Sequence, residues 1–192
     1  MKRTLGNGLN QKALFLDRDG VVNVNHGYVH TKEAFQFIEG IFELCRAATA
    51  KGYRIFIVTN QSGIARGYYS QKDFSALSRW LEHRLWLHGI AIDHTYHCPH
   101  HPQQQSKYGI TCTCRKPKPG MLFRAQRDFG INLKRSIMVG DSLSDIQCAT
   151  RAGLQHAILY GPAPHPWWPA LAKAGGKPYY RASHLRAIIP LL

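Results

Sequence analysis

The chain has 192 residues, of which 44% are hydrophobic and 19% charged, a composition typical of a globular protein with a buried core. No apolar run approaches the roughly 18 residues needed to span a bilayer, and the N-terminal segment lacks the apolar stretch of a secretory signal, so a single cytoplasmic domain over residues 1–192 is expected. The 25 Lys and Arg residues against 11 Asp and Glu residues give a formal net charge of +14, which can attract nucleic acid, an anionic membrane or a phosphorylated substrate. The sequence contains no basic block with interleaved aromatic residues, so the charge alone predicts no nucleic-acid binding.

Short apolar runs alternate with amphipathic stretches along the chain, which indicates βαβ units and a parallel sheet. Strands are predicted at Ala13–Leu16, Arg54–Val58, Thr95–His97, Ser136–Val139 and Ala157–Tyr160. Helices are predicted where apolar residues recur at steps of three and four before a glycine, namely before Gly52, Gly89 and Gly130. We therefore predict an α/β fold with a Rossmann-like parallel sheet and helices on both faces.

Two stretches show no periodicity. Residues 99–119 are rich in Pro, Gln, His, Cys and Lys, and so long a loop in a compact domain is usually functional or needs its own cross-link. The stretch Pro162–Pro169 contains Trp167 and Trp168, which we assign to packing. Cysteines occur at positions 45, 98, 112, 114 and 148, and the close spacing of the middle three favours a metal site over disulfides in an intracellular protein.

The strongest local motif is Asp17-Arg18-Asp19-Gly20, directly after the first predicted strand. Ligands of open α/β sheets bind beyond the carboxyl ends of the strands, so chemistry is expected at these carboxylates. Two carboxylates two residues apart on an extended chain point to the same side and repel, and a cation or a raised pKa must relieve the repulsion. One can then pair with a divalent cation while the other keeps a proton as a general acid, although the motif alone also fits an ordinary Asp-Gly turn.

Three further segments place complementary groups near the ends of other predicted strands. They are Val58-Thr59-Asn60-Gln61-Ser62-Gly63, Arg115-Lys116-Pro117-Lys118, and Val139-Gly140-Asp141-Ser142 followed by Asp145. Together with the paired aspartates they supply a nucleophile, donors for phosphoryl oxygens, a fixed cation and a seat for a divalent metal. Because hard carboxylate oxygens favour Mg²⁺, the sequence predicts Mg²⁺-dependent phosphoryl transfer.

In this order the motifs resemble the haloacid dehalogenase superfamily of aspartyl phosphatases. The fuller text from about Ala13 to Gly153 closely resembles the D-glycero-D-manno-heptose 1,7-bisphosphate 7-phosphatases: DRDGVVN, NHGY, TNQSGIARG, CPHHP, CTCRKPKPGM and VGDS. The related histidinol-phosphate phosphatases share the metal loop, but TNQSGIARG and RKPKPGM look more like the heptose enzymes. The resemblance implies a minimal cap and a small phosphorylated sugar as substrate, in the synthesis of nucleotide-activated heptose for the lipopolysaccharide core. A monomer is expected.

The resemblance also assigns roles to individual residues. Asp17 is expected to attack phosphorus, and Asp19 to protonate the leaving alcohol and then activate water. Thr59 and Lys116 are expected to stabilise the transferring phosphoryl group. Contacts to the sugar and its phosphates are expected from Asn25, His26, Gly27, Tyr28, Thr59, Asn60, Gln61, Ser62, Arg115 and Lys116. The family usually has Asp where this chain has Asn25, which removes a negative charge from the substrate rim.

Two metal ions are implied. Mg²⁺ is expected at Asp17, at Asp141 and at the backbone of Asp19. Three thiolates and one imidazole form a closed tetrahedral set, so a structural Zn²⁺ is expected to pin the loop at about residues 98–116. The expected zinc ligands are Cys98, His100, Cys112 and Cys114. The residues alone leave His100 and His101 open, and the family pattern selects His100.

Alternatives of two kinds stay open. Within the superfamily, the chain can be a phosphatase of histidinol phosphate or of another small phosphomonoester. The net charge of +14 motivates a nucleic-acid-binding protein on the same fold, or an enzyme acting on a nucleic-acid 3′-phosphate. The complete set of catalytic residues favours an enzyme over a binding protein. The small cap and a zinc loop at the rim disfavour a nucleic-acid substrate.

Overall fold

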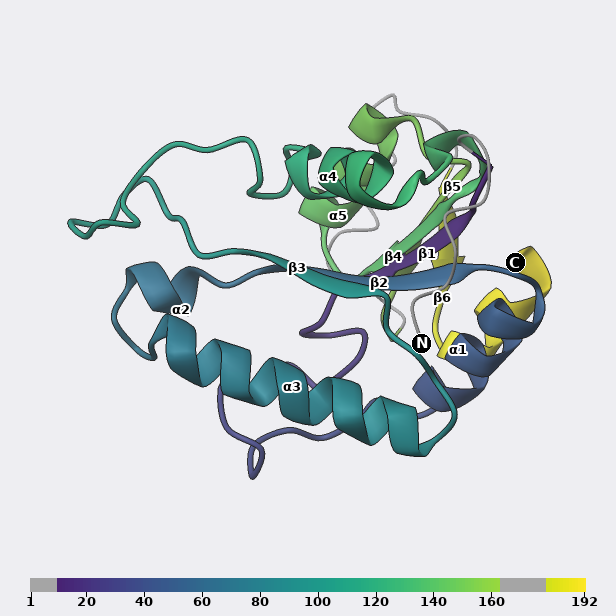
Figure 1. Cartoon of the computed structure of the whole chain (residues 1–192), viewed down its shortest axis with the longest axis horizontal. Coiled ribbons are helices and arrows are strands. Elements are labelled where there is room, and N and C mark those ends of the chain that lie inside the picture. The colour runs from purple at the N-terminus through teal and green to yellow at the C-terminus, as the bar shows by residue number, and fades with distance from the viewer. Residues whose placement is uncertain (1–9, 163–178) are drawn as a thin grey trace.

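The computed structural model describes residues 10–162 and 179–192. Within these residues the strands form one parallel six-stranded sheet in the order β3-β2-β1-β4-β5-β6 (Figure 1). The strands are β1 (Ala13–Leu16), β2 (Arg54–Asn60), β3 (His94–Cys98), β4 (Ile137–Gly140), β5 (His156–Tyr160) and β6 (Tyr180–Ala182). Trp167 and Trp168, which we assigned to packing, lie outside the described residues.

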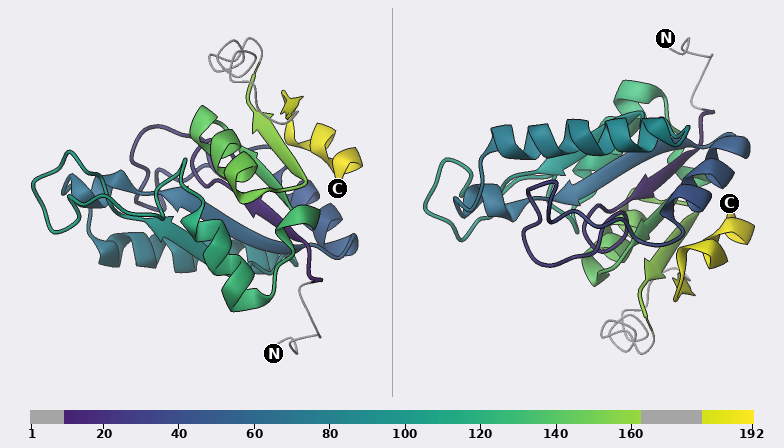
Figure 2. Two further views of the ribbon diagram at one scale, coloured as in Figure 1. Left: turned by 90° about the horizontal axis from the view of Figure 1, so that it is seen from above. Right: turned by 90° about the horizontal axis from the view of Figure 1, so that it is seen from below.

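Helices cover both faces of this sheet, as predicted. The first face carries α1 (Ile41–Ala50), α3 (Gln71–Leu87) and the 3-10 helix η2 (Leu185–Leu191), and the second carries α4 (Gly120–Phe129) and α5 (Leu143–Ala152). Figures 1 and 2 show α1 and α3 on one face and α4 and α5 on the other. Two short elements complete the set, α2 (Ser62–Ala65) after β2 and the 3-10 turn η1 (Leu133–Arg135) before β4. Among the described residues there is no helix with the length and hydropathy of a membrane span.

The central strand β1 is buried on both of its faces. Leu14 and Leu16 belong to the core under α1 and α3, whereas Ala13 and Phe15 belong to the core under α4 and α5. None of the four is more than 1% exposed. A strand covered on both sides reads as a continuous apolar run, which explains why the sequence predicted it accurately. Its carboxyl end is therefore a firmly packed support for the residues that follow.

The predicted strands are all present, with ends that shift by one or two residues. β2 continues to Asn60, so Thr59 and Asn60, expected just beyond the strand, are its last residues. Neither α2 nor β6 was predicted from the sequence. They have four and three residues, too few for a periodic pattern to emerge.

The strand order reverses at β1, which lies between β2 and β4. Asp17 follows β1, and its backbone N–H continues the ladder by donating to the Val139 carbonyl of β4 at 2.9 Å. In open α/β sheets such a reversal leaves a crevice at the carboxyl ends of the strands, where ligands bind. The topology thus gathers the ends of β1, β2 and β4 around Asp17.

Candidate active site

Three carboxylates and one ammonium group meet at this reversal point. Asp17 follows β1, Asp141 follows β4 and Asp145 lies in the first turn of α5. One carboxylate oxygen of each lies within 4.8 Å of those of the other two. Lys116 Nζ lies 2.9 Å from Asp17 Oδ1 and 2.6 Å from Asp145 Oδ1, and it donates to the Val58 carbonyl at 3.0 Å. The structure therefore brings together the residues predicted to carry phosphoryl transfer.

When its three carboxylates are all ionised, this cluster carries more negative than positive charge. Burial raises the pKa of Asp17 well above its ordinary value, opposed by Lys116 and reinforced by Asp145 and Asp141. Burial, and then Asp145, raise the pKa of Asp141 to about 7. Burial alone would lower the pKa of Lys116, but Asp145 and Asp17 raise it overall, so the ammonium group stays charged. Three carboxylates beside one ammonium group suit a divalent cation, which would favour their ionised forms.

The contacts of the carboxylates indicate which of them would hold such an ion. Asp145 is fully engaged, because Oδ1 pairs with Lys116 and Oδ2 accepts from the backbone N–H and the hydroxyl of Ser142. Asp17 accepts on Oδ1 from Lys116 and from the Arg18 backbone N–H. This leaves Asp17 Oδ2 and the carboxylate of Asp141 as possible metal ligands, and hard oxygens of this kind fit Mg²⁺.

The position of Asp141 depends on a close approach to Gly20. A Cβ atom built on Gly20 would lie 2.0 Å from Asp141 Oδ2, and Gly20 has a φ of +89°, in the left-handed region. Only glycine accommodates both conditions without strain. The glycine of the first motif therefore allows the Asp141 carboxylate to pack directly against the loop that follows β1.

A cavity of about 280 Å³ opens over the cluster and contains most of the residues predicted to contact substrate. Its lining comprises Asp17, Asp19, Asn25, Gly27, Tyr28, Thr59, Asn60, Gln61, Ser62, Tyr69, Lys116, Asp141, Ser142 and Ser144. His26 and Arg115, also predicted to contact substrate, lie outside this lining. Arg115 Nη1 instead donates to the His100 carbonyl at 3.2 Å.

Asp19, the predicted general acid, receives donors on both carboxylate oxygens. Arg18 Nη2 lies 2.9 Å from each of them, Asn23 Nδ2 donates to Oδ1 at 3.1 Å, and Gln61 Nε2 donates to Oδ2 at 2.9 Å. Arg18 is 1% exposed and also donates to the Val29 carbonyl at 2.6 Å. Sequence reasoning did not single out Arg18 or Asn23. The available signal was a charged residue placed between two site carboxylates in an otherwise buried segment.

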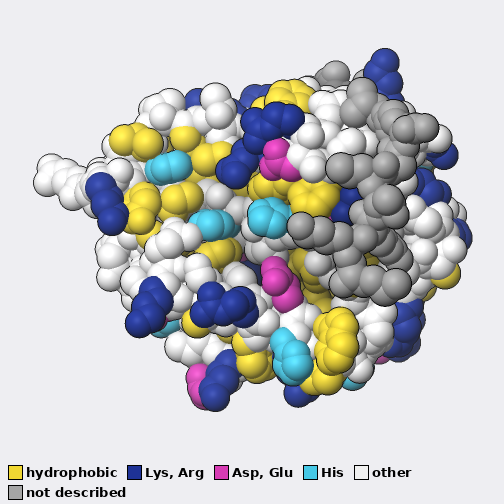
Figure 3. All heavy atoms as spheres, viewed as in Figure 1, with side chains coloured by type: hydrophobic (Ala, Val, Ile, Leu, Met, Phe, Trp, Pro, Cys, Tyr) yellow, Lys and Arg dark blue, Asp and Glu magenta, His cyan; other side chains and the backbone are white. Residues whose placement is uncertain are grey.

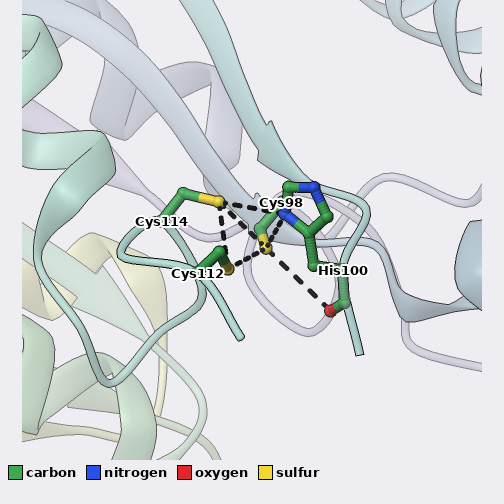
Figure 4. Close-up of side chains that lie close together, drawn as sticks. All are labelled: Cys98, His100, Cys112 and Cys114. Atoms are coloured by element: carbon green, nitrogen blue, oxygen red, sulfur yellow. Dashed lines mark hydrogen bonds between the residues drawn. The ribbon is translucent and has the colours of Figure 1, made fainter. Parts of the chain in front are cut away.

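The second predicted metal site lies in the loop after β3, where four side chains converge (Figure 4). Cys114 Sγ lies 3.2 Å from Cys98 Sγ and 3.3 Å from Cys112 Sγ, and 3.4 Å from His100 Nδ1. The sulfur separations are too long for a disulfide, which has an S–S distance of about 2.05 Å. Hydrogen bonds with Cys98, Cys112 and His100 lower the pKa of Cys114 to about 5, which favours the thiolate that binds metal.

This donor set fits a structural zinc ion. Three sulfurs and one nitrogen close a tetrahedron and leave no open position for substrate. His101, the alternative ligand, has its Nε2 3.3 Å from Arg66 Nη2 of the segment after α2, so the structure brings His100 and not His101 into the cluster. Cys45 and Cys148 are buried elsewhere in the two cores.

The fold and the site together define a HAD-like hydrolase. Residues 113–161 match the HAD-hydrolase-like family model. The structure aligns with a putative HAD-like phosphatase from Mesorhizobium loti at a TM-score of 0.82 and 31% identity, over 99% of this chain and 88% of that chain.

Sequence relatives narrow the class further. The D-glycero-beta-D-manno-heptose-1,7-bisphosphate 7-phosphatase of Haemophilus ducreyi is 46% identical over 152 residues, which are 79% of this chain and 84% of the relative. The corresponding D-glycero-alpha enzyme of Campylobacter jejuni is 49% identical over 148 residues, 77% of this chain and 81% of the relative. The D,D-heptose 1,7-bisphosphate phosphatase from B. bronchiseptica, complexed with magnesium and phosphate, aligns at a TM-score of 0.79 and 30% identity, over 94% of this chain and 97% of that chain. The chain belongs to the heptose 1,7-bisphosphate 7-phosphatase family, a family of phosphoric monoester hydrolases.

Proposed function

We propose that this chain removes the 7-phosphate of D-glycero-D-manno-heptose 1,7-bisphosphate in a Mg²⁺-dependent reaction through a phosphoaspartyl intermediate. Its place would be the synthesis of nucleotide-activated heptose for the lipopolysaccharide core. The observation that carries the proposal is the cluster of Asp17, Asp141, Asp145 and Lys116 beneath a polar cavity. The names of the relatives support the choice of sugar.

In the first step, a carboxylate oxygen of Asp17 forms a bond to phosphorus while the bond from phosphorus to the sugar oxygen breaks. Asp19 gives its proton to the departing oxygen and becomes a carboxylate, and the donors from Arg18, Asn23 and Gln61 stabilise that charge. Lys116 lies 2.9 Å from Asp17 and balances charge that develops on the phosphoryl oxygens.

In the second step, the Asp19 carboxylate takes a proton from water as the water oxygen attacks phosphorus. The bond from phosphorus to Asp17 then breaks, which releases inorganic phosphate and restores both aspartates. Mg²⁺, held by Asp17, Asp141 and the backbone of Asp19, would supply positive charge opposite the phosphoryl oxygens. Thr59 is buried at the end of β2, and its hydroxyl lines the cavity as a donor to the phosphoryl group.

Selectivity is proposed to come from the rim of the cavity. Asn25, Gly27, Tyr28 and Asn60 are part of its lining, so neutral amides and a phenol would contact the sugar. Tyr28 is braced by an edge-to-face contact with Tyr68, whose ring centroid is 4.6 Å away. Contact of Arg115 and His26 with the distal part of the substrate stays a prediction.

We propose Zn²⁺ as the structural ion of the loop that begins at Cys98. The loop carries Lys116 into the cavity, and Asn60 fixes its end through two hydrogen bonds with the Lys116 backbone, at 3.0 and 3.1 Å. None of the five cysteines forms a disulfide, and reduced cysteines are typical of a reducing compartment. A cytoplasmic location is therefore part of the proposal.

A panel of substrates tests the proposal. Phosphate release in Mg²⁺ would be measured with both anomers of the heptose bisphosphate, with histidinol phosphate, with glucose 6-phosphate and with a 3′-phosphorylated oligonucleotide. We expect fast turnover of one heptose anomer and none with Asp17→Asn. A higher kcat/KM on another substrate would overturn the substrate, whereas full activity of Asp17→Asn would overturn the mechanism.

The oligonucleotide in that panel covers the alternative motivated by the net charge. On the face drawn in Figure 3, Lys and Arg side chains are scattered between hydrophobic and neutral groups and do not form one continuous stripe. A groove that tracks a nucleic-acid backbone needs such a stripe. Binding of the oligonucleotide that weakens steeply with salt would favour this alternative.

A further inference from the structure

Among the residues predicted to contact substrate, Gln61 has the side-chain amide with the most hydrogen bonds to protein groups. It is 1% exposed, although it lines the cavity. Its Nε2 donates to Asp19 Oδ2 at 2.9 Å and to Thr59 Oγ1 at 2.8 Å, while its Oε1 accepts from the Tyr69 hydroxyl at 2.5 Å. Both ends of the amide thus have protein partners, two of which are proposed catalytic groups.

The direction of this amide matters because its two ends have opposite hydrogen-bonding character. An ionised Asp19 only accepts hydrogen bonds, and a protonated Asp19 must point its hydrogen at the leaving group and not at Gln61, so in both states the amide must present its NH₂ group to it. The oxygen of Gln61 then faces Tyr69, whose hydroxyl can donate. In the flipped orientation, the Gln61 oxygen would face the Asp19 carboxylate, and the two acceptors would repel. The Thr59 hydroxyl would then donate to Gln61 instead of the phosphoryl group.

Tyr69 is itself held in place. Its ring packs directly on Gly63, where a Cβ atom would lie only 2.2 Å from Tyr69 Cε1. On another side it stacks on the His30 ring, with centroids 5.0 Å apart and planes 8° from parallel. His30 Nδ1 in turn lies 2.7 Å from the Tyr28 carbonyl of the cavity rim. A ring fixed on two sides gives its hydroxyl one defined position.

We propose that Tyr69 is a positioning residue for the reaction: its hydroxyl fixes the Gln61 amide so that the NH₂ group orients Asp19 for proton transfer to the leaving group. This inference rests on the proposed role of Asp19 as general acid. It gives Gln61 a function that acts through Asp19, where the sequence predicted a contact to the sugar. Tyr69 lies eight residues beyond Gln61 and reaches it because the single turn of α2 folds the chain back.

Tyr69→Phe tests the proposal, because it removes the hydroxyl and keeps the ring. The assay compares kcat/KM for p-nitrophenyl phosphate with kcat/KM for the alkyl phosphomonoester that the wild-type chain turns over fastest in the panel above. The aryl leaving group departs without a proton, whereas the alkyl leaving group needs one. The ratio of the two kcat/KM values therefore separates proton donation by Asp19 from every other contribution, including that of Thr59. Because kcat/KM reports the steps up to the first irreversible one, the later water attack does not enter.

We expect Tyr69→Phe to lower kcat/KM for the alkyl ester up to about tenfold, as for loss of one hydrogen bond between neutral groups, and to change that for the aryl ester less than about threefold. Asp19→Asn should show the same selectivity with a loss of about 10²- to 10⁴-fold. In a Gln61→Met background, Tyr69→Phe should have no further selective effect.

Tyr96→Phe is the matched control, because Tyr96 is also buried and its hydroxyl donates to Asp128 at 3.1 Å on the other face of the sheet. It should leave both values unchanged. Equal losses of Tyr69→Phe on both esters, no loss on either, or an undiminished selective effect in the Gln61→Met background would overturn the inference. Hydrolysis of the aryl ester alone by the wild-type chain would also overturn it. Failure of the heptose substrate with success of another alkyl ester would overturn only the proposed substrate.

Discussion

Replacing Gly20 with alanine should disrupt the proposed Mg²⁺ site at Asp17 and Asp141 without unfolding the protein. The new Cβ atom would lie 2.0 Å from Asp141 Oδ2 and 2.5 Å from Asp141 Cγ. To reach an ordinary contact of about 3.5 Å, the carboxylate must move by roughly 1.5 Å. A displacement of about 1 Å in a catalytic group can cost on the order of 100-fold in rate, so we expect a loss of this size.

The same substitution also strains the backbone, because Gly20 has a φ of +89°. This strain costs about 1–2 kcal/mol, which for a domain of this size lowers Tm by about 2–8 °C. Gly89→Ala is the matched control, since Gly89 has a φ of +75° and no atom within 4 Å of the Cβ position. It should show a similar fall in Tm with full activity.

The assay is phosphate release as a function of Mg²⁺ concentration, with thermal unfolding of both variants beside it. We expect Gly20→Ala to need more Mg²⁺ and to reach a lower kcat, at a Tm close to that of Gly89→Ala. Activity of Gly20→Ala within about threefold of wild type would refute the reasoning, because the Asp141 carboxylate would then be free to move without consequence.

Three other predictions follow from the site and the core. His100→Ala should lose bound zinc and His101→Ala should keep it, as measured by elemental analysis of the purified variants, and equal zinc contents would contradict the assignment. Lys116→Ala should lower kcat/KM for phosphate release about 10³-fold, whereas exposed Lys118→Ala should leave it within threefold, and equal effects would remove Lys116 from the reaction. Leu81→Ala, which empties a fully buried position of α3, should lower the free energy of unfolding by about 2–5 kcal/mol in urea denaturation, and a cost below about 1 kcal/mol would contradict the packing.

The strands and the site carboxylates could be predicted because they share one physical cause. A strand buried on both faces gives an apolar run, and the polar residue that ends the run stands at the carboxyl edge of the sheet. Asp17 and Asp141 satisfy that rule, and they are adjacent because β1 and β4 are paired. The short elements α2 and β6 have no such pattern, so their existence depends on tertiary packing.

The sequence did not predict the direction in which individual side chains point. Arg115 and Lys116 are adjacent in one motif, yet Lys116 enters the cavity while Arg115 turns to the His100 carbonyl. Tyr69 shows the opposite case. It is not among the substrate contacts predicted from the sequence, yet the fold brings its hydroxyl against Gln61. Successive residues of an irregular segment point in unrelated directions, and only the packed chain decides between them.

The most direct test of the proposed function is to follow heptose 1,7-bisphosphate by ³¹P NMR during turnover with Mg²⁺. We expect the resonance of the 7-phosphate to disappear and that of inorganic phosphate to grow at the same rate, while the anomeric phosphate stays on the sugar. Loss of the anomeric phosphate first, or no reaction by a folded chain with its metals bound, would contradict the account.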